Sequence, residues 1–374
     1  MADSTKSTVV IASVLKPVDD SRMYEKIGLT LANSGKYDVH VIGIEGQPTE
    51  TPGITSHPLR PFGRLSPRRL LAHIRILLIA LRLRPRIFVI TTHELLCAAL
   101  LVKLIRGSKL IYDVQENYYW NILYTRAFPL LAKPFVALYV RLKENLSAPF
   151  IEHFLLAERG YEEELKFPRT RYTVIENKVR AEPHQRKTPA ADRGKETINL
   201  LFSGTIAEST GVFTAIDLAV KLHVIDDRIR LTIIGFCSQS RVLEKIRLLI
   251  RPRPFIQLIA RDAPIPHREI FNQIREADFG MVTYQINPST MNSVPTKLYE
   301  YLGLHLPVLL VSHKPWVDFC HRSRAAVVFN PDHYNAADIL REMLTGSFYT
   351  SDPVEVYWES EEPRLLECFE QVRR

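Results

Sequence analysis

The sequence predicts an α/β protein made of two tandem Rossmann-like, doubly wound domains. Short continuous apolar runs alternate with segments of helical periodicity, a pattern typical of a parallel sheet covered by helices on both faces. The alternation stops at a polar stretch near the middle of the chain and then begins again. At 374 residues the chain is also longer than one hydrophobic core usually organises.

Residues 1–180 form the first predicted domain. Its apolar runs predict strands at Val9–Ser13, Tyr37–Ile44, Ile87–Thr91, Lys109–Asp113, Phe154–Leu156 and Tyr172–Ile175. Its periodic segments predict helices at Arg22–Ser34, Pro67–Leu83, Leu95–Arg106 and, as one long helical region, Leu123–Leu146. The following stretch, 181–196, is rich in proline and charge and is expected to be an inter-domain linker.

Residues 197–353 form the second predicted domain, in which the same alternation recurs. Strands are predicted at Ile198–Ser203, Ile229–Ile234, Ile256–Ile259, Phe279–Tyr284, Val308–Ser312 and Ala326–Phe329. Helices are predicted at Val212–Leu222, Val242–Leu249, His267–Glu276 and from Lys297 onward. Residues 354–374 read as a helix that packs back on the first domain.

The composition is that of a soluble globular protein, with 46% hydrophobic and 24% charged residues. The four cysteines are scattered and form no C-x-x-C pair, which favours a reducing compartment and argues against a structural zinc site. The N-terminal residues do not read as a signal peptide, and no apolar run reaches transmembrane length. We therefore expect a cytoplasmic protein with no bound metal.

The formal net charge of +8 is concentrated between residues 60 and 86, where arginines alternate with aliphatic residues. Such a segment can lie on an anionic membrane surface or bind a polyanion. It can equally be a crossover helix with a solvated basic face. The density of Leu and Ile favours peripheral contact with the inner face of the cytoplasmic membrane. Nucleic acid is not an expected partner, because the arginines lack interleaved aromatic residues and no nucleic-acid motif is present.

The segment Pro295–Leu302 is the most informative for chemistry. It places Lys297 and Glu300 three positions apart at a predicted helix start, with Thr296 as the expected N-cap. Backbone N–H groups at a helix start, with a lysine beside them, attract a phosphate, and a carboxylate one turn further on can hold a ribose diol. One short helix can therefore hold both ends of a nucleoside diphosphate. The alternative is an ordinary surface ion pair.

Two glycine-containing loops follow strands of the second domain. In the loop 203–211, Gly204 allows a ligand to approach the backbone, and the hydroxyls of Ser209 and Thr210 can donate to phosphate oxygens. Gly235 follows the next strand and has the same interpretation. Each loop is also compatible with an ordinary strand–helix turn.

Polar residues follow three strands of the first domain. Asp20 and Arg22 come after the first strand, His93 and Glu94 after a later one, and Asp113 ends the next. Histidine and carboxylates at adjacent strand ends suit general acid–base catalysis or sugar-hydroxyl binding, although a histidine there can equally be a capping or packing residue. If the strand ends of the two domains face each other, they form an inter-domain cleft suited to a donor in one half and an acceptor in the other.

Several of these segments resemble those of retaining glycosyltransferases with the GT-B fold, in the large group 1, or family 4-like, class. The first half carries "TTHELL", "KLIYDVQENYY" and "YTVIENKV". The second half carries "LLFSGTIAESTGVFTAIDL", "PTKLYEYLGLHLPVLL" and "VYWESEEPRLLECFEQV". The resemblance covers nearly the whole chain, and its last segment resembles a terminal helix that crosses back to the first domain.

The resemblance implies transfer of a sugar, with retention of configuration, from a UDP- or GDP-linked sugar to a lipid-linked or polysaccharide acceptor, as in bacterial polysaccharide and lipopolysaccharide biosynthesis. It implies no cofactor and no required metal, because basic side chains and helix starts stabilise the leaving diphosphate. By the same resemblance, Lys297 and Gly204 would face the diphosphate and Glu300 would bind the donor ribose. His93 would lie near the transferred sugar.

The chain departs from that pattern at several positions. Thr205 and Thr210 stand where related enzymes carry an arginine and a lysine, and Asn292 replaces the first glutamate of the usual E-x7-E pair. Gln115 and His305 replace a histidine and a glycine. Two positive charges expected at the leaving diphosphate are therefore absent, and such charge stabilisation is often worth several kcal/mol.

Two other functions are compatible with these residues, namely a nucleotide-sugar-binding protein without transferase activity and a sugar-nucleotide epimerase. An active hexosyltransferase is favoured because Lys297 and Glu300 are both kept, and Lys297 or Arg261 would supply part of the missing charge. We predict His93 and Lys297 as catalytic residues. The predicted donor-binding residues are Gly204, Thr205, Ser209, Thr210, Gly235, Asn292, Thr296, Lys297 and Glu300.

Overall fold

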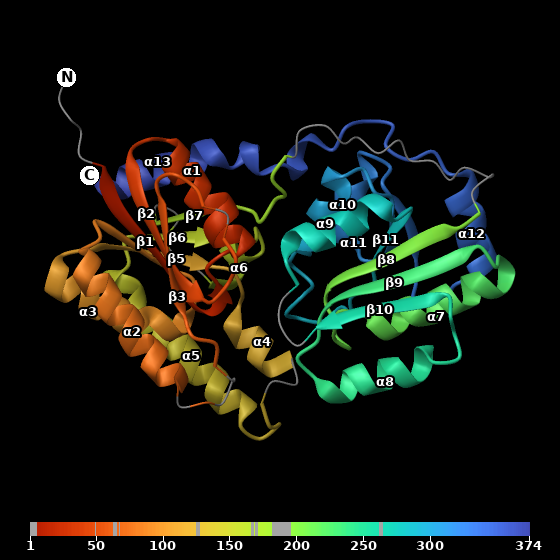
Figure 1. Ribbon diagram of the computed structural model, residues 1–374, viewed down its shortest axis with the longest axis horizontal. Coiled ribbons are helices and arrows are strands. Elements are labelled where there is room, and N and C mark those ends of the chain that lie inside the picture. Colours follow the sequence, from red (N-terminus) through yellow and green to blue (C-terminus); the bar gives the residue numbers. More distant parts are fainter. Residues whose placement is uncertain are drawn as a thin grey trace. The chain divides into compact units, whose positions relative to one another are not determined.

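The chain divides into two compact units, each built on a parallel sheet with helices on both faces (Figure 1). Unit 1 comprises Met1–Arg180 together with Trp358–Arg374, and unit 2 comprises Ala181–Tyr357. The computed structural model describes residues 6–48, 50–62, 66, 68–124, 128–165, 168, 171–181, 196–261 and 265–374. Most of the predicted linker and the predicted helix start at Pro67 lie outside the described residues.

Unit 1 contains a seven-stranded parallel sheet in the order β3-β2-β1-β4-β5-β6-β7. Its strands are β1 (Ser7–Pro17), β2 (Tyr37–Ile44), β3 (Ile54–Leu59), β4 (Ile87–Ile90), β5 (Lys109–Val114), β6 (His153–Leu156) and β7 (Tyr172–Val174). The apolar pattern predicts all of these except β3. That strand lies at the sheet edge and contains Pro58, so its sequence lacks a continuous apolar run.

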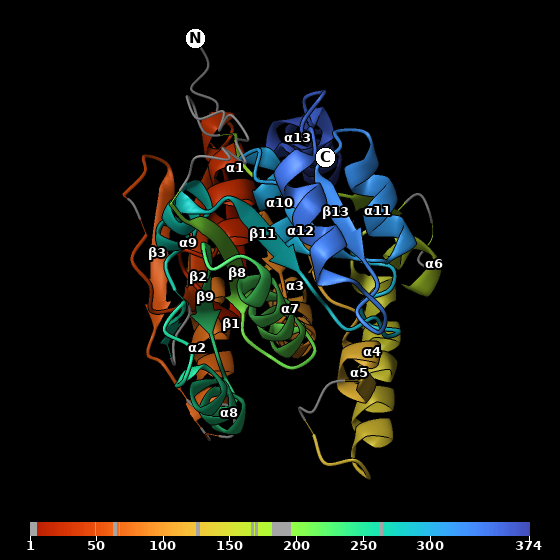
Figure 2. The same ribbon diagram turned by 90° about the vertical axis from the view of Figure 1, so that its right-hand side faces the viewer.

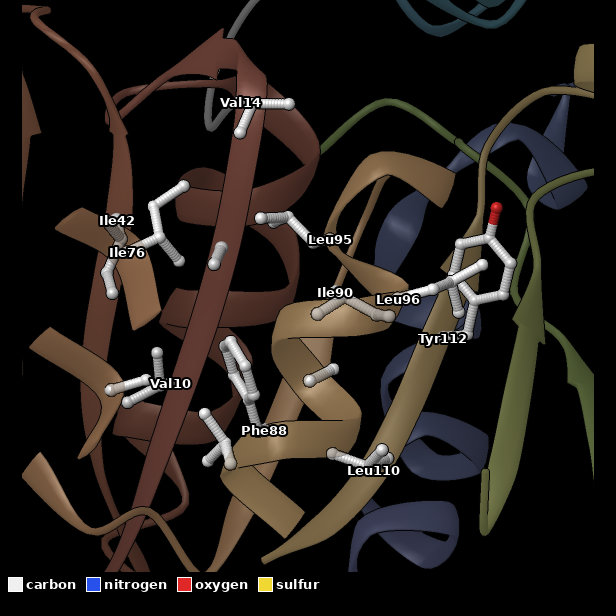
Figure 3. Packing of buried hydrophobic residues seen from close by; sticks show 14 of the residues in the cluster. Val10, Val14, Ile42, Ile76, Phe88, Ile90, Leu95, Leu96, Leu110 and Tyr112 are labelled. Atoms are coloured by element: carbon white, nitrogen blue, oxygen red, sulfur yellow. The ribbon is translucent and has the colours of Figure 1, made fainter. Parts of the chain in front are cut away.

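Each face of this sheet has its own hydrophobic core, because successive side chains of a strand point to opposite sides. Val10, Phe88 and Leu110 point to one core, which is covered by α2 and α3 (Figure 3). Ile11 and Val89 point to the other core, which is covered by η1, α1 and α13. These helices are α2 (Arg68–Leu83), α3 (Leu96–Arg106), η1 (Ser21–Gly28), α1 (Leu29–Asn33) and α13 (Glu362–Arg373).

Helix α13 completes the second core of unit 1. Leu365 and Phe369 are fully buried in it, and the Phe369 ring meets the Tyr37 ring edge-on at 6.0 Å. Trp358, just before the helix, donates from Nε1 to Thr30 Oγ1 at 2.9 Å. The helix begins at Glu362, later than its predicted start at 354, and residues 354–360 form two 3₁₀ turns instead.

The long helical region predicted at Leu123–Leu146 is two helices, α4 (Tyr118–Tyr124) and α5 (Lys133–Ser147). Pro129 lies between them and Pro134 in the first turn of α5, where proline is tolerated but cannot continue a preceding helix. The two helices pack against each other (Figure 2). A further short helix, α6 (Tyr161–Leu165), follows β6.

Unit 2 contains a six-stranded parallel sheet in the order β10-β9-β8-β11-β12-β13. The strands are β8 (Ile198–Thr205), β9 (Ile229–Phe236), β10 (Ile256–Arg261), β11 (Phe279–Val282), β12 (Val308–Val311) and β13 (Ala326–Phe329). The helices are α7 (Val212–Ile225), α8 (Ser240–Ile250), α9 (His267–Glu276), α10 (Thr296–Gly303), α11 (Lys314–His321) and α12 (Ala336–Thr345). The elements predicted from the sequence do not include α11 and α12.

None of the helices in the described part of the chain combines the length and the apolarity that crossing a membrane requires. All four cysteines are free thiols, with Cys97 exposed and the other three buried.

Candidate functional site

Each unit has a point in its sheet where the strand order reverses. In unit 1 this switch point lies between β1 and β4, and in unit 2 between β8 and β11. Ligands of open α/β sheets bind outside the carboxyl ends of the strands at such points. A buried cation follows these strands in each unit, Arg22 in unit 1 and Lys297 in unit 2.

Lys297 lies in the first turn of α10. Its side chain is only 4% exposed, and Nζ has no hydrogen-bond partner among the residues that the structure describes. Nζ lies 4.1 Å from the centre of the Phe202 ring and 5.0 Å from that of the Tyr284 ring. The faces of two aromatic rings therefore replace part of the hydration that the ammonium group has lost.

The surroundings of Lys297 disfavour its charged form. Burial lowers the pKa of Lys297 from 10.5 to about 7, and the nearby Glu300 carboxylate offsets only part of that effect. A buried ammonium group without a hydrogen-bond partner destabilises the fold. An anion that contacts Nζ would supply the partner and favour the charged form. The alternative of an exposed Lys–Glu surface pair is wrong, because Lys297 is buried.

Gly204 and Lys297 are neighbours in space. Gly204 has a φ of +93°, a conformation that favours glycine. A Cβ atom built on Gly204 would lie 3.8 Å from Lys297 Cε. The resemblance places these two residues at one diphosphate, and the structure brings them together.

Backbone packing requires a glycine at position 235. It pairs with Gly204 across β8 and β9. A Cβ atom on Gly235 would lie 1.6 Å from the Gly204 carbonyl oxygen, so any side chain would push the two strands apart. Gly235 therefore lets Gly204 take its position, and its direct role in donor binding stays a prediction.

The hydroxyl of Thr210 is used within its own loop. Oγ1 accepts from the Ala207 N–H at 3.1 Å and lies 2.9 Å from the carbonyl oxygens of Thr205 and Ala207, to which it can donate. This bonding closes the turn and does not support the predicted donation to a phosphate. The Ser209 carbonyl accepts from the Gln285 N–H at 3.0 Å, which ties the loop to the segment after β11.

The start of α10 differs from the prediction. Pro295, with φ −55° and ψ 132°, is the N-cap residue, and it makes no side-chain cap hydrogen bond. Thr296 is the first helical residue, so its predicted role as N-cap is wrong. Proline has no side-chain acceptor, so no N-cap side chain accepts from the backbone N–H groups in the first turn of α10. Asn292 lies on the turn before α10 with its side chain exposed.

Glu300 follows Lys297 by about one helical turn, and a histidine holds its carboxylate. His267 Nε2, at the start of α9, lies 3.0 Å from Glu300 Oε1. The Glu300 side chain is 12% exposed, so part of it faces solvent. The sequence gives no signal for His267, because the contact spans 33 residues and His267 belongs to no motif.

Arg261, the other candidate for the missing positive charge, has a partner within unit 2. Its guanidinium group pairs with Glu269 at 2.8 Å, and both side chains are exposed. Thr205 is exposed and uncharged. Of the two candidates considered from the sequence, Lys297 is therefore the one placed at the loop glycine. Among the described residues, no group of three or more His, Cys, Asp or Glu side chains could hold a metal ion.

The buried cation of unit 1 has a carboxylate partner. Arg22 Nε lies 3.0 Å from Asp113 Oδ2, and Nη2 lies 2.7 Å from Asp113 Oδ1. Burial lowers the pKa of Arg22, but the charge and hydrogen bonds of Asp113 more than offset it, so the pKa is raised overall. Gln115 Nε2 also donates to Asp113, at 2.8 Å, and Asp20 caps η1. The Nη1 atom of Arg22 is buried without a hydrogen-bond partner.

His93 begins the short turn η2 (His93–Leu95) after β4. Its ring meets the Tyr118 ring edge-on at 4.6 Å, and its Nδ1 is buried without a partner. Burial, with the charge of Lys143 adding to it, lowers the pKa of His93 to about 4. His93 is therefore neutral at pH 7, which suits hydrogen bonding to a ligand better than proton transfer.

The chain is similar over nearly its whole length to solved structures. The HepE protein of Anabaena, solved in complex with UDP-glucose, is 11% identical over 97% of this chain and 99% of its own, with a TM-score of 0.66. Sucrose-phosphate synthase of Thermosynechococcus elongatus is 12% identical over 98% of this chain and 99% of its own, with a TM-score of 0.72.

A UDP-forming α,α-trehalose-phosphate synthase of Burkholderia xenovorans is 10% identical over 99% of this chain and 100% of its own, with a TM-score of 0.65. No protein-family model and no curated protein sequence matches the chain. At these identities the likeness shows the fold, which is the GT-B fold of two Rossmann-like units, as the sequence predicts.

Proposed function

We propose that this protein is a retaining hexosyltransferase that uses a nucleoside-diphosphate sugar as donor. The observation that carries the proposal is Lys297, a buried ammonium group beside Gly204 that has no hydrogen-bond partner among the described residues. A diphosphate oxygen would supply that partner, and Glu300, one turn further on, would accept the ribose hydroxyls. UDP-glucose in the HepE complex supports a UDP-linked sugar as the donor class.

In the proposed reaction the bond between the anomeric carbon and the diphosphate oxygen breaks. A bond to the acceptor oxygen forms on the same face of the sugar, and the acceptor proton leaves with the diphosphate. Negative charge develops on the leaving oxygen, and protonated Lys297 together with the start of α10 stabilises it. Neutral His93 hydrogen-bonds a hydroxyl of the transferred sugar. No cofactor is assigned to the reaction.

The proposed acceptor is a lipid-linked glycan or a polysaccharide, with the protein acting at the inner face of the cytoplasmic membrane. Support comes from α2, which carries four arginines and no acidic residue and leaves Leu70 and Leu78 exposed. The two synthases among the structural neighbours are named for sugar phosphates, which makes a sugar phosphate the second candidate acceptor.

A binding protein without transferase activity is the second candidate function. It is favoured by Thr205 and Thr210, which provide no charge at the diphosphate. A thermal-shift panel of UDP, GDP and ADP sugars, followed by turnover assays of each ligand that binds, separates the candidates. We expect one donor to raise the melting temperature and to release nucleoside diphosphate, with the product anomer retained by NMR.

Binding of several donors without release of nucleoside diphosphate from any of them would favour the binding protein. An epimerase would return the nucleotide sugar with one ring carbon inverted, and also without release of nucleoside diphosphate. Either result would overturn the transferase proposal.

A further inference from the structure

Three helices of unit 1 present apolar side chains to solvent. Helices α2 and α3 pack side by side over one face of the seven-stranded sheet, and α5 contacts α3 and reaches the same face through Tyr112 and Glu144 (Figure 1). We call their solvent-facing side the apolar face. Six of its side chains are between 60% and 82% exposed, namely Leu70, Leu78, Leu104, Phe135, Leu138 and Leu146.

Helix α5 is apolar on two sides. Its inner side buries Ala137 and Val140. Its outer side carries Phe135, Leu138 and Leu146, at helical spacing, and these are exposed. A helix that is apolar all round is normally buried, and monomeric soluble proteins rarely expose large contiguous apolar patches. The outer side of α5 therefore fits a partner that takes up apolar side chains.

The charge around the apolar face is positive. Helix α2 has four arginines, α3 has one lysine and one arginine, and α5 has two lysines and one arginine. Neither α2 nor α3 has an acidic residue, and the one acidic residue of α5, Glu144, is buried. Among the described residues, Glu94 and Glu152 from flanking segments pair with Arg69 and Lys103, and Arg141 lies 3.8 Å from Glu144. Arg106 and Lys133 donate to backbone carbonyl oxygens, which carry no net charge.

We propose that the apolar face lies on an anionic lipid bilayer and that α5 supplies the side chains that insert most deeply. Apolar side chains enter the boundary between headgroups and acyl chains, while lysines and arginines reach the phosphates. The proposal rests on the proposed function for the choice of a membrane-bound acceptor. The membrane contact predicted from the sequence involves the basic stretch 60–86, which contains α2. The present proposal extends that contact to α3 and α5.

A second copy of the chain is the competing occupant of this face. A symmetric dimer would bring two faces of the same positive charge together. Like charges in an interface oppose association, whereas an anionic bilayer is complementary to them. Charge therefore favours the bilayer.

Vesicle binding tests the proposal. Flotation with phosphatidylcholine vesicles containing 30% phosphatidylglycerol compares the wild type with Phe135→Ser/Leu138→Ser and with a matched control in unit 2, Val224→Ser/Leu248→Ser. The control residues are 81% and 70% exposed, so both pairs remove exposed apolar side chains. We expect the α5 variant to lose about tenfold or more in partitioning, the control to match the wild type, and pure phosphatidylcholine to bind weakly.

Three results would overturn the proposal: absence of wild-type binding at low salt, wild-type partitioning by the α5 variant, or a sedimenting dimer that Phe135→Ser/Leu138→Ser dissociates. A nucleotide thermal-shift assay on the same samples shows that the variants are folded. Donor turnover without vesicle binding would defeat this proposal alone. Vesicle binding without donor turnover would defeat the proposed function and leave this surface standing.

Discussion

The buried cations of the two units differ in their partners although both follow strands at a switch point. Arg22 is held by Asp113 through Nε and Nη2, and its pKa is raised. Lys297 has aromatic rings beside Nζ and no hydrogen-bond partner in the described part of the chain, and burial lowers its pKa to about 7. The paired cation contributes to the integrity of unit 1. The unpaired cation destabilises unit 2 and is available to a ligand. Two cations that are buried to a similar degree therefore have opposite effects on stability.

Removing the paired cation should produce the largest change in stability. Arg22→Met leaves the Asp113 carboxylate buried without its cation, and we expect the free energy of unfolding to fall by about 3–5 kcal/mol in urea denaturation. The double variant Arg22→Met/Asp113→Leu should recover most of the loss, because it removes both charges. A loss below about 1 kcal/mol for the single variant would contradict a structural role for the pair.

Removing the unpaired cation should affect activity rather than stability. Lys297→Met keeps an apolar chain of similar length and removes a charge that lacks a hydrogen-bond partner, so the unfolding free energy should stay equal or rise. Donor turnover should fall by about 10²–10³-fold, as when one group that stabilises a leaving anion is lost. If stability falls as far as in Arg22→Met, the two cations do not differ in the way proposed.

The pH dependence of stability and of nucleotide affinity tests the same difference between Lys297 and Arg22. The pKa of Lys297 is about 7 in the folded protein against 10.5 for an ordinary lysine, so between these values the unfolded chain binds more protons than the folded one. The free energy of unfolding should therefore increase as pH rises from about 7 toward 10.5, because Lys297 loses its proton in the folded protein. Below pH 7 the buried ammonium group lowers the free energy of unfolding by its full amount. Diphosphate binding favours the charged lysine, so nucleotide affinity should fall above pH 7.

Isothermal titration with UDP from pH 7 to 9 measures this fall, which we expect to reach at most about tenfold per pH unit. Lys297→Met should bind more weakly at pH 7 and show little further change. A wild-type affinity that is flat across the range would contradict the lowered pKa.

The smallest effect is expected at the carboxylate beside Lys297. Glu300→Gln keeps the shape of the side chain but weakens its hydrogen bonds to ribose hydroxyls, and we expect about a tenfold loss of UDP affinity. The preference for UDP over 2′-deoxy-UDP should shrink in parallel. His267→Gln should reduce affinity less, because His267 acts through the orientation of Glu300. Unchanged discrimination in Glu300→Gln would place the ribose elsewhere.

The sequence predicts the two parallel sheets well, because strands covered on both faces are apolar at every position, as in Ile87–Ile90 and Val308–Val311. Elements with little burial leave a weaker pattern. Edge strand β3 is an example, and a change of direction at Pro129 divides what the pattern predicts as one helix.

The candidate site is predictable where local chemistry marks it and not where distant segments meet. The spacing of Lys297 and Glu300 identifies α10, and Gly204 is marked by its place after a strand. The partner His267 lies 33 residues from Glu300, and Asp113 lies 91 residues from Arg22. Such pairs depend on the packing of elements, which no single-sequence spacing encodes. The bonds of Thr210 within its loop are equally invisible in the sequence.

The membership of α13 in unit 1 has a consequence for synthesis of the protein. Tyr37, Leu31 and their neighbours form a core face that Leu365 and Phe369 cover. A ribosome must first translate all of Ala181–Tyr357, which takes on the order of ten seconds or more at about 5–20 residues per second. During that interval the nascent first half carries an uncovered apolar surface. Chaperone engagement of the nascent chain should therefore persist until Trp358–Arg374 has left the exit tunnel.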